Sequence, residues 1–109
     1  FYFEESCGQC TPCREGTGWL YRVVHRIETG QGKMEDLALL DNVADNIAGR
    51  TICALGDAAA LPVKSFLKHF RHEFVHHIEH KNCLVGKDIE PKWGRAGAFL
   101  SPAEKRRAA

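Results

Sequence analysis

The segment Cys7-Gly8-Gln9-Cys10-Thr11-Pro12-Cys13 holds three cysteines, each three residues after the one before. At this spacing the three sulfur atoms can turn toward one point. A fourth cysteine, Cys53, lies farther along, in the loop-like segment 49–57. Three neighbouring thiolates and one remote thiolate often hold a single iron–sulfur cube, because soft sulfur ligands match the covalent iron–sulfide core. This ligand set indicates electron transfer rather than the making or breaking of substrate bonds.

The spacing of the cysteines leaves two other uses open. Zinc is commonly held by four cysteines, although such sites usually consist of two separated C-x2-C pairs. A redox dithiol or a chance grouping is the second alternative, and a C-x-x-C redox pair needs a thioredoxin-like βαβ context that the sequence does not show. The fifth cysteine, Cys83, follows the last predicted helix and is interpreted as an ordinary thiol rather than a spare ligand.

A second pattern, His72-Glu73-Phe74-Val75-His76, matches the H-E-x-x-H sequence of zinc proteases. On a helix its two histidines would share one face, and Glu73 would be the general base. A metzincin continues with glycine at position 79 and histidine at position 82, whereas this chain has Glu79 and Asn82. We therefore interpret the segment as part of a solvated helix face that carries four histidines, His69, His72, His76 and His80.

The composition argues against several other classes of protein. The 109 residues suffice for one domain with a modest core. A net charge of +1 gives no indication of a nucleic-acid or membrane-surface partner. No apolar run approaches the roughly 20 residues of a membrane span, and no signal-peptide pattern opens the chain. Five cysteines, an odd number, fit a disulfide framework poorly and favour a reducing, cytosol-like compartment. Because the first residue is not methionine, we expect a piece of a larger protein.

Helical periodicity predicts the elements that must position the cysteines. Apolar residues recur at helical spacing over 14–29, with Trp19 expected in the core. Two glycines, Gly16 and Gly18, weaken the first turns of this helix and are expected to delay its start. A second amphipathic pattern covers 34–48. Cys53 then returns to the first three cysteines from between the second and third helices.

The third helix is predicted to begin at Asp57, a good N-cap residue. Pro62 is placed near its first turn, because a proline deeper in a helix costs about 3 kcal/mol. Residues 72–81 either extend this helix or form a fourth. Four apolar residues of this region are expected to point inward, Leu61, Phe66, Leu67 and Phe70.

These elements predict an all-α fold, a small helical bundle of about four helices that begins with a cysteine loop. No strand ladder or repeat is visible. Residues 1–83 form the predicted helical iron–sulfur domain. The remaining segment, 84–109, has no sustained period and is predicted to be a basic, irregular tail. An interaction module whose basic tail docks a partner is an alternative function of the chain.

Residues 5–16, Glu-Ser-Cys-Gly-Gln-Cys-Thr-Pro-Cys-Arg-Glu-Gly, resemble the signature of the NADH-binding flavoprotein subunit of respiratory complex I. The segment 51–57 around Cys53 resembles that subunit's second signature. Residues 69–73 resemble a stretch near the end of the subunit, where proline commonly stands in place of His72. The H-E-x-x-H match would then result from this one substitution. The resemblance covers residues 1–83.

The resemblance implies a C-terminal helical domain that binds one [4Fe–4S] cluster through four cysteines, here Cys7, Cys10, Cys13 and Cys53. FMN and NADH are bound mainly by a preceding Rossmann-like domain, which this sequence lacks, as it lacks an intervening ubiquitin-like domain. The fragment alone is therefore expected to have no NADH dehydrogenase activity. In the family, residues beside the fourth ligand approach the flavin, so Ala54 and Leu55 are candidates for FMN contact.

The resemblance also implies a place in an electron-transfer chain. In that family NADH reduces FMN, and the cluster accepts single electrons from the flavin and passes them along the iron–sulfur chain toward quinone. The implied partners are the upstream FMN- and NADH-binding domain of the same chain, a thioredoxin-like [2Fe–2S] subunit and the large iron–sulfur subunit. No nucleic acid and no direct membrane insertion are expected. The implied location is cytoplasmic, peripheral on the inner face of the bacterial plasma membrane.

The cysteine pattern also occurs in a related group of enzymes. NAD-linked hydrogenases and formate dehydrogenases use a similar diaphorase subunit, and the cysteines alone do not distinguish these from complex I. The segments 16–20 and 69–73 are more similar to complex I, which is the interpretation we prefer.

Overall fold

The computed structural model describes residues 1–84, and most of this part of the chain is helical. Its five helices are α1 (Tyr2–Glu5), α2 (Thr11–Glu28), α3 (Glu35–Ile47), α4 (Leu55–His69) and α5 (Arg71–His80). Residues 1–84 contain no strand, which confirms the predicted all-α class. The predicted tail, beyond Leu84, lies outside the described residues.

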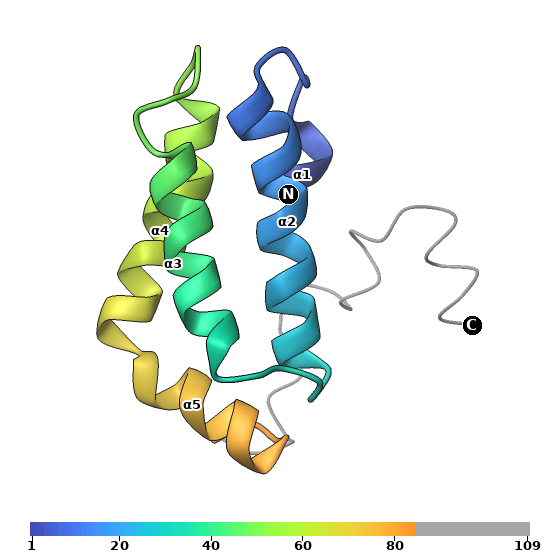
Figure 1. The fold of residues 1–109 in the computed structure, drawn as a ribbon, viewed down its shortest axis with the longest axis vertical. Coiled ribbons are helices and arrows are strands. Elements are labelled where there is room, and N and C mark those ends of the chain that lie inside the picture. Colours follow the sequence, from blue (N-terminus) through green and yellow to red (C-terminus); the bar gives the residue numbers. More distant parts are fainter. Residues whose placement is uncertain (85–109) are drawn as a thin grey trace, which may run out of the picture.

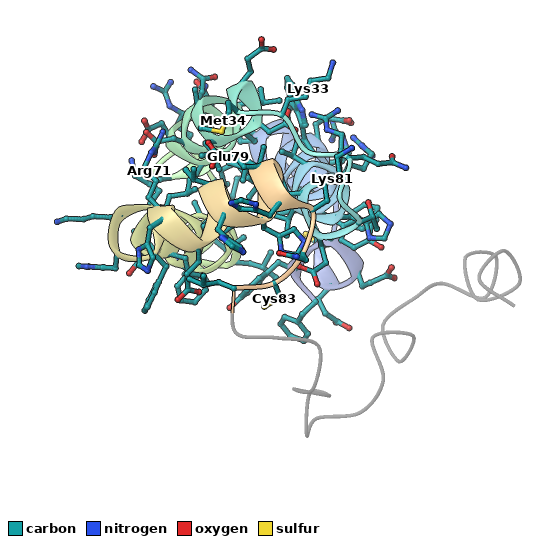
Figure 2. The ribbon with its side chains drawn as sticks, turned by 90° about the horizontal axis from the view of Figure 1, so that it is seen from below. Lys33, Met34, Arg71, Glu79, Lys81 and Cys83 are labelled. Atoms are coloured by element: carbon teal, nitrogen blue, oxygen red, sulfur yellow. The ribbon has the colours of Figure 1, made fainter. Side chains whose placement is uncertain are left out.

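The three long helices lie side by side and α5 crosses one end of them (Figure 1). α2 and α4 both run away from the end of the bundle that carries the cysteine loop and the α3–α4 loop, and α3 runs back toward it. The two loops therefore meet at the same end of the bundle. Seen from the opposite end, α5 crosses the base of the bundle from Arg71, and Lys81 and Cys83 follow its C-terminal end (Figure 2).

A single apolar core joins α2, α3, α4 and α5. Full burial of one leucine or isoleucine side chain contributes about 1.5–3 kcal/mol, so a core of this size can hold a small bundle together. Its central side chains, Leu37, Leu40 and Ile47, come from α3 and are at most 1% exposed. The other buried members of the core are Leu20, Val23, Ile27, Val43, Ala44, Ala60, Leu67 and Ile78.

α2 begins at Thr11, three residues before the predicted helix and with Pro12 in its first turn, where proline is well tolerated. The expectation that its glycines delay the helix is wrong, because both are buried at close contacts. A Cβ atom on Gly16 would lie 2.6 Å from Ile47 Cδ1, and one on Gly18 would lie 2.9 Å from the Phe3 ring. The glycines let α3 and α1 approach the backbone of α2.

Two other expectations for the first half of the chain are corrected. Trp19 is 47% exposed rather than in the core, because the buried face of α2 is formed by Leu20, Val23 and Ile27. The short helix α1 was not predicted, since its four residues contain no complete helical period. It lies against α2, where the Phe3 and Tyr21 rings stack with their centroids 5.6 Å apart.

α4 differs from its prediction at both its start and its middle. It begins at Leu55, so Asp57 lies inside the first turn instead of capping it. The Asp57 carboxylate accepts a hydrogen bond of 2.7 Å from the backbone N–H of Gly49 and so ties the preceding loop to the helix. Pro62 lies inside the helix rather than near its first turn. Tertiary packing of α4 on the core thus overrides the local cost of proline.

The inward face of α4 is also rotated relative to the prediction. Leu67 is buried as expected, but Leu61, Phe66 and Phe70 are 59%, 53% and 46% exposed. The small side chains of Ala59 and Ala60 face the core instead, which lets α4 pack closely on it. Between the open alternatives for residues 72–81, the structure has a separate helix, because the chain breaks at Phe70 (φ −121°, ψ 26°).

A buried carboxylate joins α2 to the start of α3. Asp36 is 3% exposed and receives two hydrogen bonds from the Arg26 guanidinium and one of 2.9 Å from the Lys33 backbone N–H. Burial by itself raises the pKa of Asp36, but the bonds from Arg26 and Lys33 outweigh it, and the pKa lies below its ordinary value. The ionised carboxylate therefore stabilises the folded state.

We expect the Asp36→Asn variant to lose about 1.5–3 kcal/mol of unfolding free energy near neutral pH, because it loses charged hydrogen bonds. A lowered folded-state pKa means that this contribution is complete above the unfolded-state pKa, about 4, and disappears as the pH falls through the folded-state value. Urea unfolding of parent and variant from about pH 7 to about pH 3 measures this contribution. The difference between their unfolding free energies should shrink on acidification. Asp45→Asn, at the exposed ion pair with Lys64, serves as control and should change little. A pH-independent Asp36 difference would contradict the assignment.

The contact at Gly16 gives a second prediction. Gly16→Ala should destabilise the bundle by about 1–3 kcal/mol because its Cβ would overlap Ile47, although alanine alone favours a helix interior by up to about 1 kcal/mol. Unfolding free energies of the two single variants and of Gly16→Ala/Ile47→Ala complete a double-mutant cycle. Gly16→Ala should cost much less when Ile47 is already alanine; an equal cost in both backgrounds would show that this contact is not the cause.

Candidate metal centre

The structure brings the four predicted ligands to one cavity. The cavity has a volume of about 260 Å³ and lies where the cysteine loop meets the α3–α4 loop. Cys7 and Cys10 come from the loop before α2, Cys13 from the first turn of α2, and Cys53 from the loop before α4. The other lining residues are Glu5, Ser6, Gln9, Ile52 and Leu55.

The cysteine loop is held in shape by backbone geometry and by one arginine. Gly8 has φ +75°, a left-handed conformation that glycine adopts without steric cost. The Arg14 guanidinium donates 2.9 Å to the Gly8 carbonyl and 3.2 Å to the Thr11 hydroxyl, so it bridges the loop to α2. Cys10 is the N-cap of α2, and Cys13 is only 6% exposed.

The loop that carries Cys53 is fastened at several points. The Thr51 hydroxyl donates 2.8 Å to the Cys53 carbonyl. Thr51 also packs against Gly56 so closely that a Cβ atom on the glycine would lie 2.3 Å from Thr51 Cγ2. Together with the hydrogen bond from Gly49 to Asp57, these contacts fix the approach of Cys53 to the N-terminus of α4.

Sequence reasoning did not single out Ser6, which also lines the cavity. Its hydroxyl oxygen lies 3.1 Å from Cys13 Sγ and accepts a hydrogen bond of 3.4 Å from the Gly8 backbone N–H. Ser6 follows α1, whose presence the sequence did not reveal. Its signals in the sequence were its position directly before Cys7 and its place in the signature of residues 5–16.

Two helix N-terminal ends at the cavity favour negative charge there, although the one carboxylate among its lining residues, that of Glu5, opposes it. Cys10 and Cys13 lie at the N-terminal end of α2, and Cys53 directly precedes the N-terminal end of α4. The free N–H groups and the dipole at a helix N-terminus stabilise a nearby thiolate or other anion. Two such ends meet here, and together they suit a group with several thiolate ligands.

The chemistry of the residues that line the cavity fits an iron–sulfur group. All five cysteines in residues 1–84 are free thiols, so four are available as soft ligands around the cavity. Within the described part of the chain, no three Cys, His, Asp or Glu side chains are grouped as ligands of one metal ion. The four thiols instead surround a space, with Cys13 buried and Cys7 and Cys53 exposed.

Of the other residues considered for the centre, Ala54 and Leu55 lie at or beside the cavity, and Cys83 does not. Leu55 lines the cavity, and Ala54 is the exposed N-cap of α4 beside Cys53. Their predicted contact with FMN stays a prediction. Cys83 is exposed at the opposite end of the bundle, after α5 (Figure 2), so the structure does not bring it to the other four cysteines.

The H-E-x-x-H residues lie on α5, away from the cysteine cavity. His72 is exposed, with its Nε2 3.9 Å from Glu73 Oε1. His76 lies 3.1 Å from the Asn82 side-chain oxygen, and its ring is 4.4 Å from that of His80. Among residues 1–84, these side chains do not form a three-ligand metal site. The interpretation of the motif as a largely solvated helix face agrees with this arrangement.

Comparison with known proteins places this centre in a family. Residues 1–77 match the model of the NADH-ubiquinone oxidoreductase-F iron–sulfur binding region. The chain belongs to this family. The resemblance seen in the sequence is therefore confirmed, and the matched residues include all four cavity cysteines.

Several bacterial relatives are similar over most of the chain. The F-type subunit of NADH-quinone oxidoreductase in Streptomyces coelicolor is 55% identical over 93 residues, which are 85% of this chain and 21% of the relative. The F-type subunit in Mycobacterium bovis is 54% identical over 83 residues, 76% of this chain and 19% of the relative. The second F-type subunit of Rhizobium meliloti is 53% identical over 83 residues, 76% of this chain and 20% of the relative. The chain thus spans about a fifth of the length of these relatives.

Of the helices formed by residues 1–84, none combines the length and the apolar character that crossing a bilayer requires.

The separation of α5 from the cavity gives a prediction for the histidines. The double variant His72→Gln/His76→Gln should incorporate as much iron as the parent on anaerobic reconstitution, because neither side chain lines the cavity. Iron and sulfide analysis measures this, with circular dichroism as a check on folding. A folded double variant that loses its iron would overturn the assignment of the metal centre to the cysteine cavity.

Proposed function

We propose that this chain is the cluster-binding domain of the F-type subunit of an NADH-quinone oxidoreductase and acts as a one-electron relay. The observation that carries the proposal is the meeting of Cys7, Cys10, Cys13 and Cys53 around one cavity between two helix N-termini. A [4Fe–4S] cluster bound there supplies reversible one-electron chemistry without a change in substrate bonds. Family membership supports an iron–sulfur group at this place.

The residues around the cavity have separate tasks in this proposal. The four thiolates hold the metal. The N-terminal ends of α2 and α4 offset the negative charge that four thiolates bring. Ile52 and Leu55 add apolar surface, and exclusion of water is one of the factors that sets a cluster's potential. Arg14 and Gly8 keep the first loop in the shape that presents Cys7 and Cys10.

The exposed side of the centre is where we place exchange of electrons. Cys7 and Cys53 are exposed, as is Ala54, so electrons can pass here over a short distance to a neighbouring group. We propose that FMN, reduced by NADH in an upstream domain of the same polypeptide, is the donor. The acceptors are the iron–sulfur chain of the large subunit, with a thioredoxin-like [2Fe–2S] subunit nearby, on the way to quinone. The complex would lie on the cytoplasmic face of the bacterial plasma membrane.

The names of the relatives favour this assignment over the diaphorase subunit of a hydrogenase or a formate dehydrogenase. Those quoted from Streptomyces, Mycobacterium and Rhizobium are all subunits of NADH-quinone oxidoreductase.

A structural four-cysteine zinc site is the other alternative. Zinc sites usually combine two separated C-x2-C pairs, whereas here three neighbouring cysteines and one remote cysteine line the cavity, and the matching family model is that of an iron–sulfur binding region.

The proposal is tested by anaerobic reconstitution of the chain with iron and sulfide. We expect about four irons and four sulfides per chain, visible absorption that dithionite bleaches, and an electron paramagnetic resonance signal in the reduced state. Cys53→Ser should abolish stable assembly of the cube. Cys83→Ser is the matched control and should retain it, because Cys83 lies at the other end of the bundle.

Two results would contradict the proposal. If Cys53→Ser keeps four irons with unchanged spectra, the ligand set is wrong. If the parent chain binds one zinc ion through these cysteines and no sulfide under the same conditions, the centre is structural.

A further inference from the structure

A serine hydroxyl contacts the most buried of the four cysteines. Ser6 Oγ lies 3.1 Å from Cys13 Sγ, and Cys13 is 6% exposed, the least of any cavity cysteine. Hydrogen bonds to ligand sulfur are among the factors that set the potential of an iron–sulfur cluster. They act more strongly where water is excluded. This contact is therefore placed where it can affect a bound group.

The direction of this hydrogen bond follows from its neighbours. In the free thiol either atom can donate. A cysteine that ligates iron is a thiolate and has no proton to give, so in the loaded protein Ser6 must be the donor. The Ser6 oxygen already accepts the Gly8 N–H at 3.4 Å, which leaves its own O–H free to point at the sulfur.

The short helix α1 explains why Ser6 lies over Cys13. Ser6 is the C-cap of α1, and its backbone N–H donates 3.1 Å to the carbonyl of Tyr2, the first residue of that helix. α1 in turn rests on α2, through Phe3 against Gly18 and the stacked rings of Phe3 and Tyr21. Helix α1 thus has a definite role in holding one hydroxyl over a sulfur atom.

Two other hydroxyls near the ligands do not reach sulfur. Thr17 donates 2.7 Å to the Cys13 carbonyl, and Thr51 donates 2.8 Å to the Cys53 carbonyl. Within residues 1–84, Ser6 is the one serine or threonine whose hydroxyl is hydrogen-bonded to a cavity cysteine's sulfur. Thr17, whose hydroxyl is bonded to the carbonyl of Cys13 and not to its sulfur, therefore serves as the matched control.

We propose that Ser6 is a positioning residue that raises the reduction potential of the bound cluster by donating its hydroxyl hydrogen bond to the Cys13 sulfur. The inference rests on the proposed function. Reduction adds one electron and therefore one negative charge. A donor proton at the sulfur stabilises the reduced state more than the oxidised state, because the attraction grows with the charge on the sulfur.

The test compares the potentials of reconstituted variants by redox titration monitored by electron paramagnetic resonance. Ser6→Ala should titrate at a lower potential, with the equilibrium constant for reduction about threefold to tenfold smaller, which is about 28–59 mV at 59 mV per tenfold change. Ser6→Thr keeps a hydroxyl, so its potential should stay near that of the parent. Valine has the shape of threonine without the hydroxyl, so the potential of Ser6→Val should fall as in Ser6→Ala. Thr17→Val, which removes a hydroxyl that is bonded to the carbonyl of the same cysteine rather than to its sulfur, should leave the potential near that of the parent.

The outcomes separate this inference from the proposed function. If the parent chain takes up no iron and sulfide on reconstitution, the proposed function itself is contradicted. A loaded parent whose potential is unchanged in Ser6→Ala or Ser6→Val, or lowered equally in Ser6→Thr and Ser6→Val, overturns the role of the hydroxyl.

If the variants without a hydroxyl do not assemble the cluster, the hydrogen bond is tested in the unsubstituted protein. After brief exchange into D2O, pulsed electron paramagnetic resonance of the reduced protein should detect a rapidly exchanged deuteron coupled to the cluster. A strong coupling, as expected for a hydroxyl deuteron held against a ligand sulfur, supports the hydrogen bond from Ser6, and the absence of such a strongly coupled deuteron overturns it.

Discussion

The close approach of α2 to α3 at Gly16 is the constraint on which the metal centre depends. Ile47, the last residue of α3, occupies the place where a side chain on Gly16 would lie. The chain leaves α3 at this contact and immediately forms the loop that carries Cys53. Cys13, one turn before Gly16 on α2, is thereby brought near that loop. A larger side chain at position 16 would move Cys13 away from the loop that carries Cys53, and so separate the two parts of the proposed ligand set.

The same packing determines the electrostatic character of the centre. α2 and α4 run in the same direction because α3 returns the chain between them, so both present their N-terminal ends to the cavity (Figure 1). An antiparallel pair would offer one positive end and one negative end. The order of three helices therefore creates an environment for an anionic group before any individual charged side chain is considered. Arg14 acts through hydrogen bonds to the loop rather than as the sole source of positive charge.

The parts of the fold that depend on local patterns could be predicted from the sequence. Helical periodicity gave the all-α class, and cysteine spacing gave a set of four residues that the structure places around one cavity. The rotation of α4 could not be predicted from hydrophobicity, because packing favours the small Ala59 and Ala60 at the core and leaves Phe66 outside. Likewise, the contact of Ser6 with Cys13 depends on how α1 rests on α2, which no local pattern in the sequence encodes.

The separation of Cys13 and Cys53 along the chain has a consequence for cofactor loading. The two residues are 40 positions apart, and this segment includes most of α2 and all of α3. A group bonded to both is a covalent crosslink that closes a long loop and removes conformational entropy from the unfolded chain. By the relation used for disulfides, a loop of this length corresponds to about 4 kcal/mol. Insertion of the cofactor would thus also stabilise the fold. A chain that fails to acquire it lacks this crosslink, so it unfolds more often and is cleaved more readily by proteases.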